Sequence, residues 1–323
     1  MNVIGHKRVL LPNGKVRDEL PTRWIRTLSV ATVAATYCLI VLGSTVRLTN
    51  SGMGCPGWPL CSGKYGPIDK FSPLIEQSHR YLASVVTVLI VLIALLVWRT
   101  RPPARVLRWP ASFAVGVIVV QIGLGAVTVL TKNAPWTVAA HLLVALLLLS
   151  IVTVVAVGSF VSPEQSWLTT YHLSHSAWRA VGGLFLIFIS GSLVVDGGAQ
   201  SACQTWLICS HSAASGGLIT LQLVHRAMVL VGGTFVVVYL IGLLRSRSLS
   251  RSHRNFVVLG LALLVLQITV GVFNSALGAP AGIADLHLAM AAALWIVIVA
   301  LASTPVHDAT IVAHTPVVGV RGH

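Results

Sequence analysis

Residues 138–160 read VAAHLLVALLLLSIVTVVAVGSF, a stretch of 23 residues without a charged side chain. At about 1.5 Å per residue, a helix of this length covers the ~30 Å of hydrocarbon in a bilayer. The stretch therefore predicts a membrane-spanning helix, and this helix carries a histidine, His141, near its beginning.

Seven further apolar runs flank this stretch, and the loops between them hold nearly all charges and prolines. The runs cover residues 27–46, 82–98, 111–130, 180–195, 217–244, 256–274 and 284–302. Only 9% of the 323 residues are charged and 55% are apolar, which excludes an ordinary soluble domain. We expect an all-α integral membrane protein with eight transmembrane helices.

The basic residues indicate the orientation in the membrane. With the N-terminus inside, the inner loops and tails hold 15 Lys and Arg residues and the outer loops hold 4. Positive residues favour the cytoplasmic side, so we expect both termini in the cytoplasm of a multi-pass cell-membrane protein. The net charge of +14 does not indicate nucleic acid, because the basic residues are neither interleaved with aromatics nor gathered on one soluble face.

The chain resembles itself at an offset of 146 residues. This offset superposes Gln121 on Gln267, Gly125 on Gly271, His141 on His287, and Glu76-Gln-Ser-His79-Arg80 on Gln222-Leu-Val-His225-Arg226. Four spans per unit make the two units parallel repeats. The predicted organisation is a cytoplasmic tail at 1–23, four-helix repeats at 24–160 and 161–303, and a cytoplasmic tail at 304–323.

Two cysteine pairs have the same spacing and lie in loops assigned to the outside. Cys55 and Cys61 fall on Cys203 and Cys209 at an offset of 148. An oxidising exterior favours disulfides, each worth about 2–3 kcal/mol for so short a loop. A metal site is the alternative, although two sulfurs fall short of four ligands. Cys38, in the first span, is expected to be a small packing residue.

Four of the twelve histidines are assigned to the predicted transmembrane helices, one to each even-numbered helix and all to the outer leaflet; His79 lies three residues before the run at 82–98. They are His79 and His141 in the first repeat, and His225 and His287 in the second. Two neutral imidazoles that face each other across a four-helix bundle can hold a haem iron by both axial positions. We therefore expect one bis-histidine haem per repeat. Hydrogen bonding to a neighbouring helix is the alternative for any single histidine, and zinc would be half coordinated.

Polar residues near the histidines extend this interpretation. Arg80 and Arg226 are candidates to bind haem propionates, because a guanidinium in the membrane needs an anion; snorkelling to the interface is the alternative. Gln121 and Gln267 are expected to form interhelical hydrogen bonds rather than to ligate a metal.

Glu76 lies three residues before His79, on the same helical face, whereas its repeat mate Gln222 carries no charge. This asymmetry suggests that one site is reactive and the other holds a permanent cofactor. A carboxylate beside a haem edge could stabilise positive charge or orient water, or it could cap the helix. With both iron faces occupied, we expect oxidation of a haem substituent, with electrons passed to the second haem.

The chain resembles the haem A synthase family through Glu76-Gln-Ser-His79-Arg80, which matches its ExxHR signature, and through the outer loop from Arg47 to Cys61. The resemblance implies successive hydroxylation of the C8 methyl of haem O to the formyl group of haem A. It also implies that His79 and His141 bind the substrate haem beside a catalytic Glu76, and that His225 and His287 hold a permanent haem b.

The partners implied are haem O, membrane lipid, a haem O synthase and an electron acceptor; a homo-oligomer stays open, and no nucleic acid is expected. A non-enzymatic dihaem b-type electron-transfer cytochrome is the main alternative. It explains the histidines but not the difference between Glu76 and Gln222. A transporter built from parallel repeats would need broken helices, which the sequence lacks.

Overall fold

The computed structural model describes residues 20–55, 57–58, 60–61, 70–99, 104–160, 174–205, 209, 214–246 and 249–304. Residues 1–19 and 305–323, which make up most of the two predicted tails, lie outside this part of the chain. So do residues 161–173, at the predicted boundary between the repeats.

The described residues form eight α-helices and one short 3-10 helix, η1 (Ala104–Leu107). The α-helices are α1 (Leu20–Leu48), α2 (Phe71–Arg99), α3 (Arg108–Leu130), α4 (Pro135–Phe160), α5 (His175–Asp196), α6 (Gly216–Arg245), α7 (Arg251–Ala276) and α8 (Ala281–Ala302). Each of these eight helices is long and apolar enough to cross a membrane. The predicted all-α fold with eight spans is confirmed, and the chain is a multi-pass membrane protein.

Two helix boundaries differ from the apolar runs in an informative way. α2 begins at Phe71, eleven residues before the predicted run, because its first three turns are amphipathic rather than uniformly apolar. These turns carry Glu76 and His79. α5 begins at His175, where Ser174 caps the helix by accepting a hydrogen bond of 3.2 Å from the backbone N–H of Ala177.

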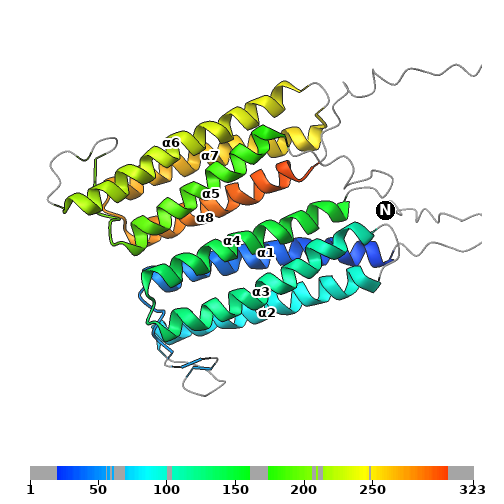
Figure 1. The fold of residues 1–323 in the computed structure, drawn as a ribbon, viewed down its shortest axis with the longest axis horizontal. Coiled ribbons are helices and arrows are strands. Elements are labelled where there is room, and N and C mark those ends of the chain that lie inside the picture. The colour runs from blue at the N-terminus through cyan, green and yellow to red at the C-terminus, as the bar shows by residue number, and fades with distance from the viewer. Residues whose placement is uncertain are drawn as a thin grey trace, which may run out of the picture.

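The eight helices form two bundles that lie side by side, α1 to α4 and α5 to α8 (Figure 1). Around the first bundle, extensive packing joins α1 to α2, α2 to α3, α3 to α4 and α4 to α1, so α2 and α4 lie diagonally opposite. The same cycle runs through α5, α6, α7 and α8, which places α6 and α8 on a diagonal. The helices that carry the four histidines therefore face each other across the two bundle axes.

The bundles meet along α1, α4, α5 and α8. Trp295 of α8 stands in the middle of this interface, where its indole N–H donates to Ser150 Oγ of α4 at 2.9 Å. The ring of Phe188 packs edge-on against that indole, with centroids 5.8 Å apart. Aromatic packing and a satisfied N–H thus stabilise the interface at a depth where no water is available.

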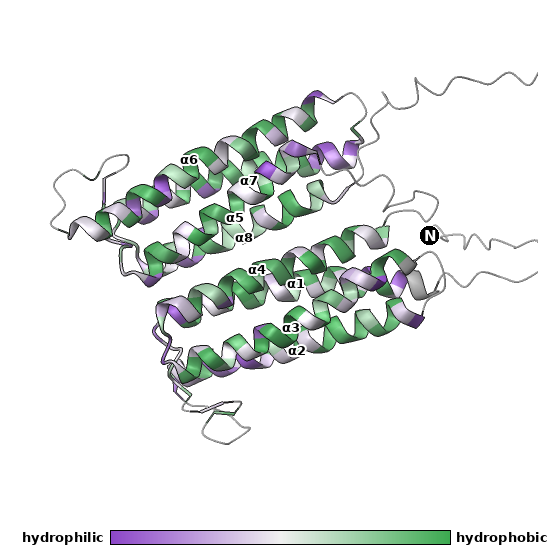
Figure 2. Ribbon diagram, in the orientation of Figure 1, coloured by the Kyte–Doolittle hydropathy of each residue, from purple (hydrophilic) through white to green (hydrophobic). Residues whose placement is uncertain are grey.

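Apolar residues cover the outside of the bundles, and polar residues concentrate near the helix ends (Figure 2). Large side chains such as Val119, Leu230 and Val265 are about two-thirds exposed, at 64%, 67% and 65%. This pattern is typical of a surface that faces lipid. Cys38 is also exposed, so the expectation that it packs between helices is wrong: it lies on the outer face of α1.

An ion pair joins the two bundles at the ends that carry the cysteine loops. Arg47, in the last turn of α1, donates from Nη2 to Asp196 Oδ1 at 2.9 Å and from Nε to the same oxygen at 3.1 Å. Asp196 is the last residue of α5, and its side chain is only 6% exposed. A carboxylate is unfavourable at the negative end of a helix, so Asp196 depends on the guanidinium of Arg47.

Replacing Arg47 by alanine should lower the melting temperature of the detergent-purified protein, because the buried Asp196 carboxylate loses its partner. We expect a loss of about 2 kcal/mol, between the ~1 kcal/mol of an exposed pair and the roughly 3–5 kcal/mol of a buried one. The double variant R47A/D196N should be more stable than R47A, because it also removes the orphaned charge. An R47A protein as stable as the wild type would contradict this account.

Candidate functional site

Each of the four membrane histidines lies against a glycine of the preceding helix. His79 of α2 packs on Gly43 of α1, and the same arrangement recurs for His141 on Gly125, His225 on Gly191 and His287 on Gly271. A Cβ atom built on any of these glycines would come within 2.7–3.3 Å of the imidazole ring. Glycine is therefore required for the ring to approach the neighbouring backbone so closely.

The histidines associate in the two pairs expected from the bundle diagonals. His79 and His141 lie near enough to interact electrostatically, and so do His225 and His287. In the described part of the chain, no three His, Cys, Asp or Glu side chains come together as a metal site would require. Each pair is thus a two-imidazole site, which is a donor set for the axial positions of a haem rather than for tetrahedral zinc.

A glutamine contacts the second histidine of each pair in the same way. Gln121 donates from Nε2 to the His141 carbonyl at 3.0 Å, which confirms the expected interhelical hydrogen bond. Its amide also lies 3.3 Å from His141 Nε2, and Gln267 lies at the same distance from His287 Nε2. Equivalent positions of the two halves therefore build equivalent surroundings.

Several buried polar atoms at these sites have no hydrogen-bond partner among the residues that the structure describes. They are the Nδ1 atoms of His141 and His287 and the Oε1 atoms of Gln121 and Gln267. Buried polar groups are nearly always satisfied, so the protein by itself leaves these sites incomplete. A haem between the two imidazoles of each pair would fit these observations, because it would engage one ring nitrogen of His141 and one of His287.

The two sites differ at the first histidine of each pair. Ser190 Oγ lies 2.9 Å from His225 Nδ1, which orients the ring and leaves Nε2 for a ligand. The repeat-equivalent residue at the first site is Leu42, one residue before Gly43, and its side chain cannot form a hydrogen bond. A partner on the second ring nitrogen is the usual way in which proteins fix a metal-binding imidazole.

Glu76 connects the first site to the cysteine loop above it. Its side chain is buried, Oε2 accepts the backbone N–H of Cys55 at 2.8 Å, and Oε1 accepts from Arg80 Nη2 at 2.5 Å. Arg80 also donates from Nη1 to the Gly57 carbonyl at 3.0 Å. Both carboxylate oxygens of Glu76 are thus engaged, and its charge is paired.

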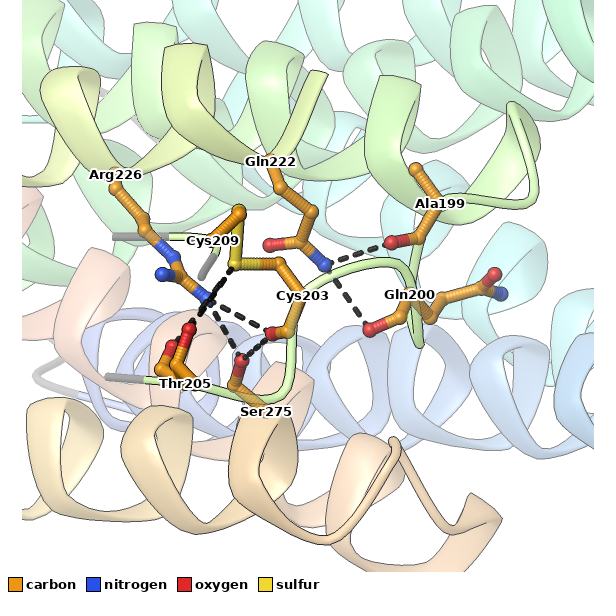
Figure 3. Close-up of a disulfide and its surroundings, with 8 residues drawn as sticks. All are labelled: Ala199, Gln200, Cys203, Thr205, Cys209, Gln222, Arg226 and Ser275. Carbon is orange, nitrogen blue, oxygen red and sulfur yellow. Dashed lines mark hydrogen bonds between the residues drawn. A yellow bond between two sulfur atoms is a disulfide. The ribbon is translucent and has the colours of Figure 1, made fainter. Parts of the chain in front are cut away.

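Gln222 donates hydrogen bonds to the second loop, whereas Glu76 accepts one from the first (Figure 3). Its amide nitrogen donates to the carbonyls of Ala199 at 2.7 Å and Gln200 at 3.0 Å. The first loop presents a donor to the helix and the second presents acceptors. The difference between Glu76 and Gln222 therefore matches the polarity of the loop backbone above each.

The arginines that follow the histidines also have different partners. Arg226 donates from Nη2 to the Cys203 carbonyl at 3.0 Å and to Ser275 Oγ at 2.9 Å, as Figure 3 shows. Its Nη1 atom is buried and has no hydrogen-bond partner in the described part of the chain. Arg226 can therefore still bind an anion, whereas the charge of Arg80 is already paired with Glu76.

Disulfides join Cys55 to Cys61 and Cys203 to Cys209 within the described residues. The first loop lies directly on the beginning of α2: a Cβ atom on Gly54 would come within 2.7 Å of the Pro73 nitrogen. Each loop is thus closed by a disulfide and anchored to the helix that carries the first histidine of the pair below it.

Sequence reasoning missed three residues of these sites, namely Gly43, Gly191 and Ser190. The loop offset of 148 superposes Gly43 on Gly191, so the repeat itself held the signal for both glycines. Nothing comparable marks Ser190, because its repeat mate is a leucine and serines are common in membrane helices.

The chain is similar to proteins named haem A synthase. It is 29% identical to that of Geobacillus thermodenitrificans over 191 residues, which cover 57% of this chain and 60% of the relative. It is 27% identical to that of Bacillus pumilus over 217 residues, 64% of this chain and 71% of the relative. A protoheme IX farnesyltransferase of Halobacterium salinarum is 31% identical over 121 residues, 38% of this chain and 26% of the relative.

A family model named COX15-CtaA and described as a cytochrome oxidase assembly protein matches residues 26–72 and 68–299. These ranges include all eight helices that carry or surround the two sites, with only the ends of α1 and α8 left out. The chain therefore belongs to the COX15-CtaA family of cytochrome oxidase assembly proteins.

Proposed function

We propose that this protein is a haem A synthase, an oxidoreductase that converts the C8 methyl group of haem O into a formyl group. The proposal rests on two histidine pairs that occupy equivalent positions in the two bundles but have different polar surroundings. Relatives named haem A synthase support it. The match covers only 60% of the length of the first of these relatives. The activity is therefore proposed from the two sites of this chain.

The second site, between His225 and His287, is proposed to hold a permanent haem b. Ser190 fixes the ring of His225 before any ligand binds, and the buried Nη1 of Arg226 supplies a donor for a propionate. Preorganised ligands reduce the entropy lost on binding and slow dissociation, which is what a resident cofactor requires.

The first site, between His79 and His141, is proposed to bind haem O. The ring of His79 lacks the serine that orients His225, so this site is less preorganised and suits a molecule that must enter and leave. Glu76 holds a buried negative charge three residues from His79. We assign to Glu76 the task of stabilising positive charge, or orienting water, at the substituent being oxidised.

The proposed reaction is a four-electron oxidation: each of two hydroxylations takes an oxygen atom from water and releases two electrons and two protons, and the resulting gem-diol loses water to give the aldehyde. A haem b at the second site would accept these electrons one at a time and would pass them to the external electron acceptor. The protein has to orient the haem O ring by His79 and His141 and to keep bulk water out. The loop closed by Cys55 and Cys61 lies over this site and is suited to the second task.

The cysteine loops are proposed to lie on the outer side of the cell membrane, with the basic helix ends in the cytoplasm. The helix ends that border the cysteine loops, the end of α1 with the start of α2 and the end of α5 with the start of α6, lie at one end of the bundles (Figure 1). The opposite ends of α2, α3, α6 and α7 are the terminal residues Arg99, Arg108, Arg245 and Arg251. An enzyme that supplies haem O is the expected partner.

The test of this function is the haem extracted from membranes that contain this protein and a supply of haem O. We expect part of the haem O to appear as haem A, and purified protein to show a b-type spectrum. Unchanged haem O together with a b-type spectrum would instead support the dihaem cytochrome. Colourless protein in haem-replete cells would contradict both functions.

Replacing a histidine should affect the two haems separately. H225A and H287A should lose the b-type absorption of the purified protein, because each removes one axial ligand of the resident haem. H79A should retain that absorption and lose haem O conversion. The same spectrum in all three variants would contradict the assignment of the resident haem to the second half.

The variant E76Q should retain the b-type spectrum but lose conversion at least ~100-fold, the scale of a positioned acid or base. Because Glu76 also holds the loop through Cys55, the double variant C55S/C61S provides the control: it removes the disulfide and keeps the carboxylate. We expect a smaller loss in C55S/C61S than in E76Q. Equal losses would reduce Glu76 to a loop anchor, and full activity of E76Q would remove it from the mechanism.

A further inference from the structure

The last turn of α1 contacts the histidine helix of its own bundle and both interface helices of the other. Gly43 packs on His79 of α2. Two residues later, Thr45 Oγ1 donates to Asp285 Oδ2 of α8 at 2.6 Å. Asp285 in turn lies two residues before His287. A connection between the two histidine pairs therefore runs from His79 through Gly43, Thr45 and Asp285 to His287.

The hydrogen bond between Thr45 and Asp285 occurs on one side of the interface and has no counterpart at the equivalent position on the other. The repeat relates the contact of α1 with α8 to the contact of α5 with α4. At the offsets of 148 and 146, the counterparts of Thr45 and Asp285 are Leu193 and Ala139. Leucine and alanine thus occupy the equivalent positions in the contact of α5 with α4. Packing of the two bundles therefore does not require a polar pair.

The carboxylate of Asp285 is also only partly satisfied by hydrogen bonds within the described residues. Asp285 is the fifth residue of α8, and its Oδ1 atom is buried and finds no hydrogen-bond partner among the described residues. Carboxylates within membrane helices are costly and generally serve a function. The single hydrogen bond from Thr45 is what orients this side chain toward the first bundle.

We propose that Thr45 and Asp285 are positioning residues that hold the second histidine pair at a set distance and orientation from the first. The inference rests on the proposed function, in which electrons leave the haem O ring at the first site and reach the haem b at the second. Electron transfer rates fall steeply with distance, so a rigid connection between the two ligand helices sets the rate of this step. The position of the Asp285 carboxylate relative to the haem b also contributes to its midpoint potential.

The test compares T45V, which keeps the shape of the side chain and removes the hydroxyl, with T45S, which retains it. The matched control is T49V, one turn further along the chain, because the Thr49 hydroxyl bonds within its own segment to the Thr45 carbonyl and to Ser51 Oγ. The measurements on full-length purified protein are the amount of bound haem b, its midpoint potential and the rate of its reduction by bound haem O in a single turnover.

We expect T45V to bind as much haem b as the wild type but to show a shifted potential and a reduction rate at least ~5-fold lower. T45S and T49V should match the wild type in both measurements. A purely structural role would lower the melting temperature of T45V without moving the potential, and this result would overturn the proposal. A T45V protein with wild-type potential and rate would do the same.

If the wild-type protein binds no haem b, the proposed function is refuted, but the coupling between Thr45 and Asp285 is not. That coupling is then tested by the melting temperatures of T45V, D285A and the double variant. Residues that interact give non-additive effects in such a cycle. Additive effects would show that Thr45 and Asp285 are not coupled and would overturn the inference.

Discussion

The structure depends on the absence of water from the interior of a bilayer. Every polar group within the eight helices has to find its partner in the protein, because lipid offers none. Polar residues in the spans are therefore few, and several have a specific neighbour: His79 lies on Gly43, and Asp196 binds Arg47. Among the described residues, the buried atoms without a hydrogen-bond partner include Nδ1 of His141 and of His287 and Oε1 of Gln121 and of Gln267. These atoms distinguish the histidine pairs from ordinary interhelical contacts.

The two halves have the same arrangement of helices but form different hydrogen bonds to the loops above their sites. Glu76 accepts a backbone N–H from the first loop, whereas Gln222 donates to two backbone carbonyls of the second. The residue type at this position is thus matched to the polarity of the loop backbone. A carboxylate that anchors a loop can still act on a substrate below it, so a structural role and the proposed chemical role of Glu76 are compatible. Because Glu76 has both roles, a loss of activity on its substitution identifies the chemical role only when the loop is varied independently.

Membership of the COX15-CtaA family is consistent with this division of labour. Ser190 and Arg226 give the second site an oriented imidazole and a spare donor, whereas the first site has a paired arginine and no serine. A resident cofactor benefits from such preorganisation, and a substrate that must be released as product benefits from its absence. The asymmetry between the sites therefore supports one enzyme with two roles rather than two copies of one electron carrier.

The eight spans, their order and the register of the two halves follow from the amino-acid sequence alone. Uniformly apolar runs permit one solution in lipid, and the repeat aligns His79 with His225 without reference to coordinates. The sequence also singled out Glu76, Arg80 and the cysteine pairs as residues with chemistry. What tertiary structure decided is which residues meet: Ser190 with His225, Thr45 with Asp285, and Arg47 with Asp196. The last two contacts join helices that are far apart in the chain. In all three, bundle packing decides which side of a helix faces its partner, and a uniformly apolar helix carries no periodic pattern from which that side could be predicted.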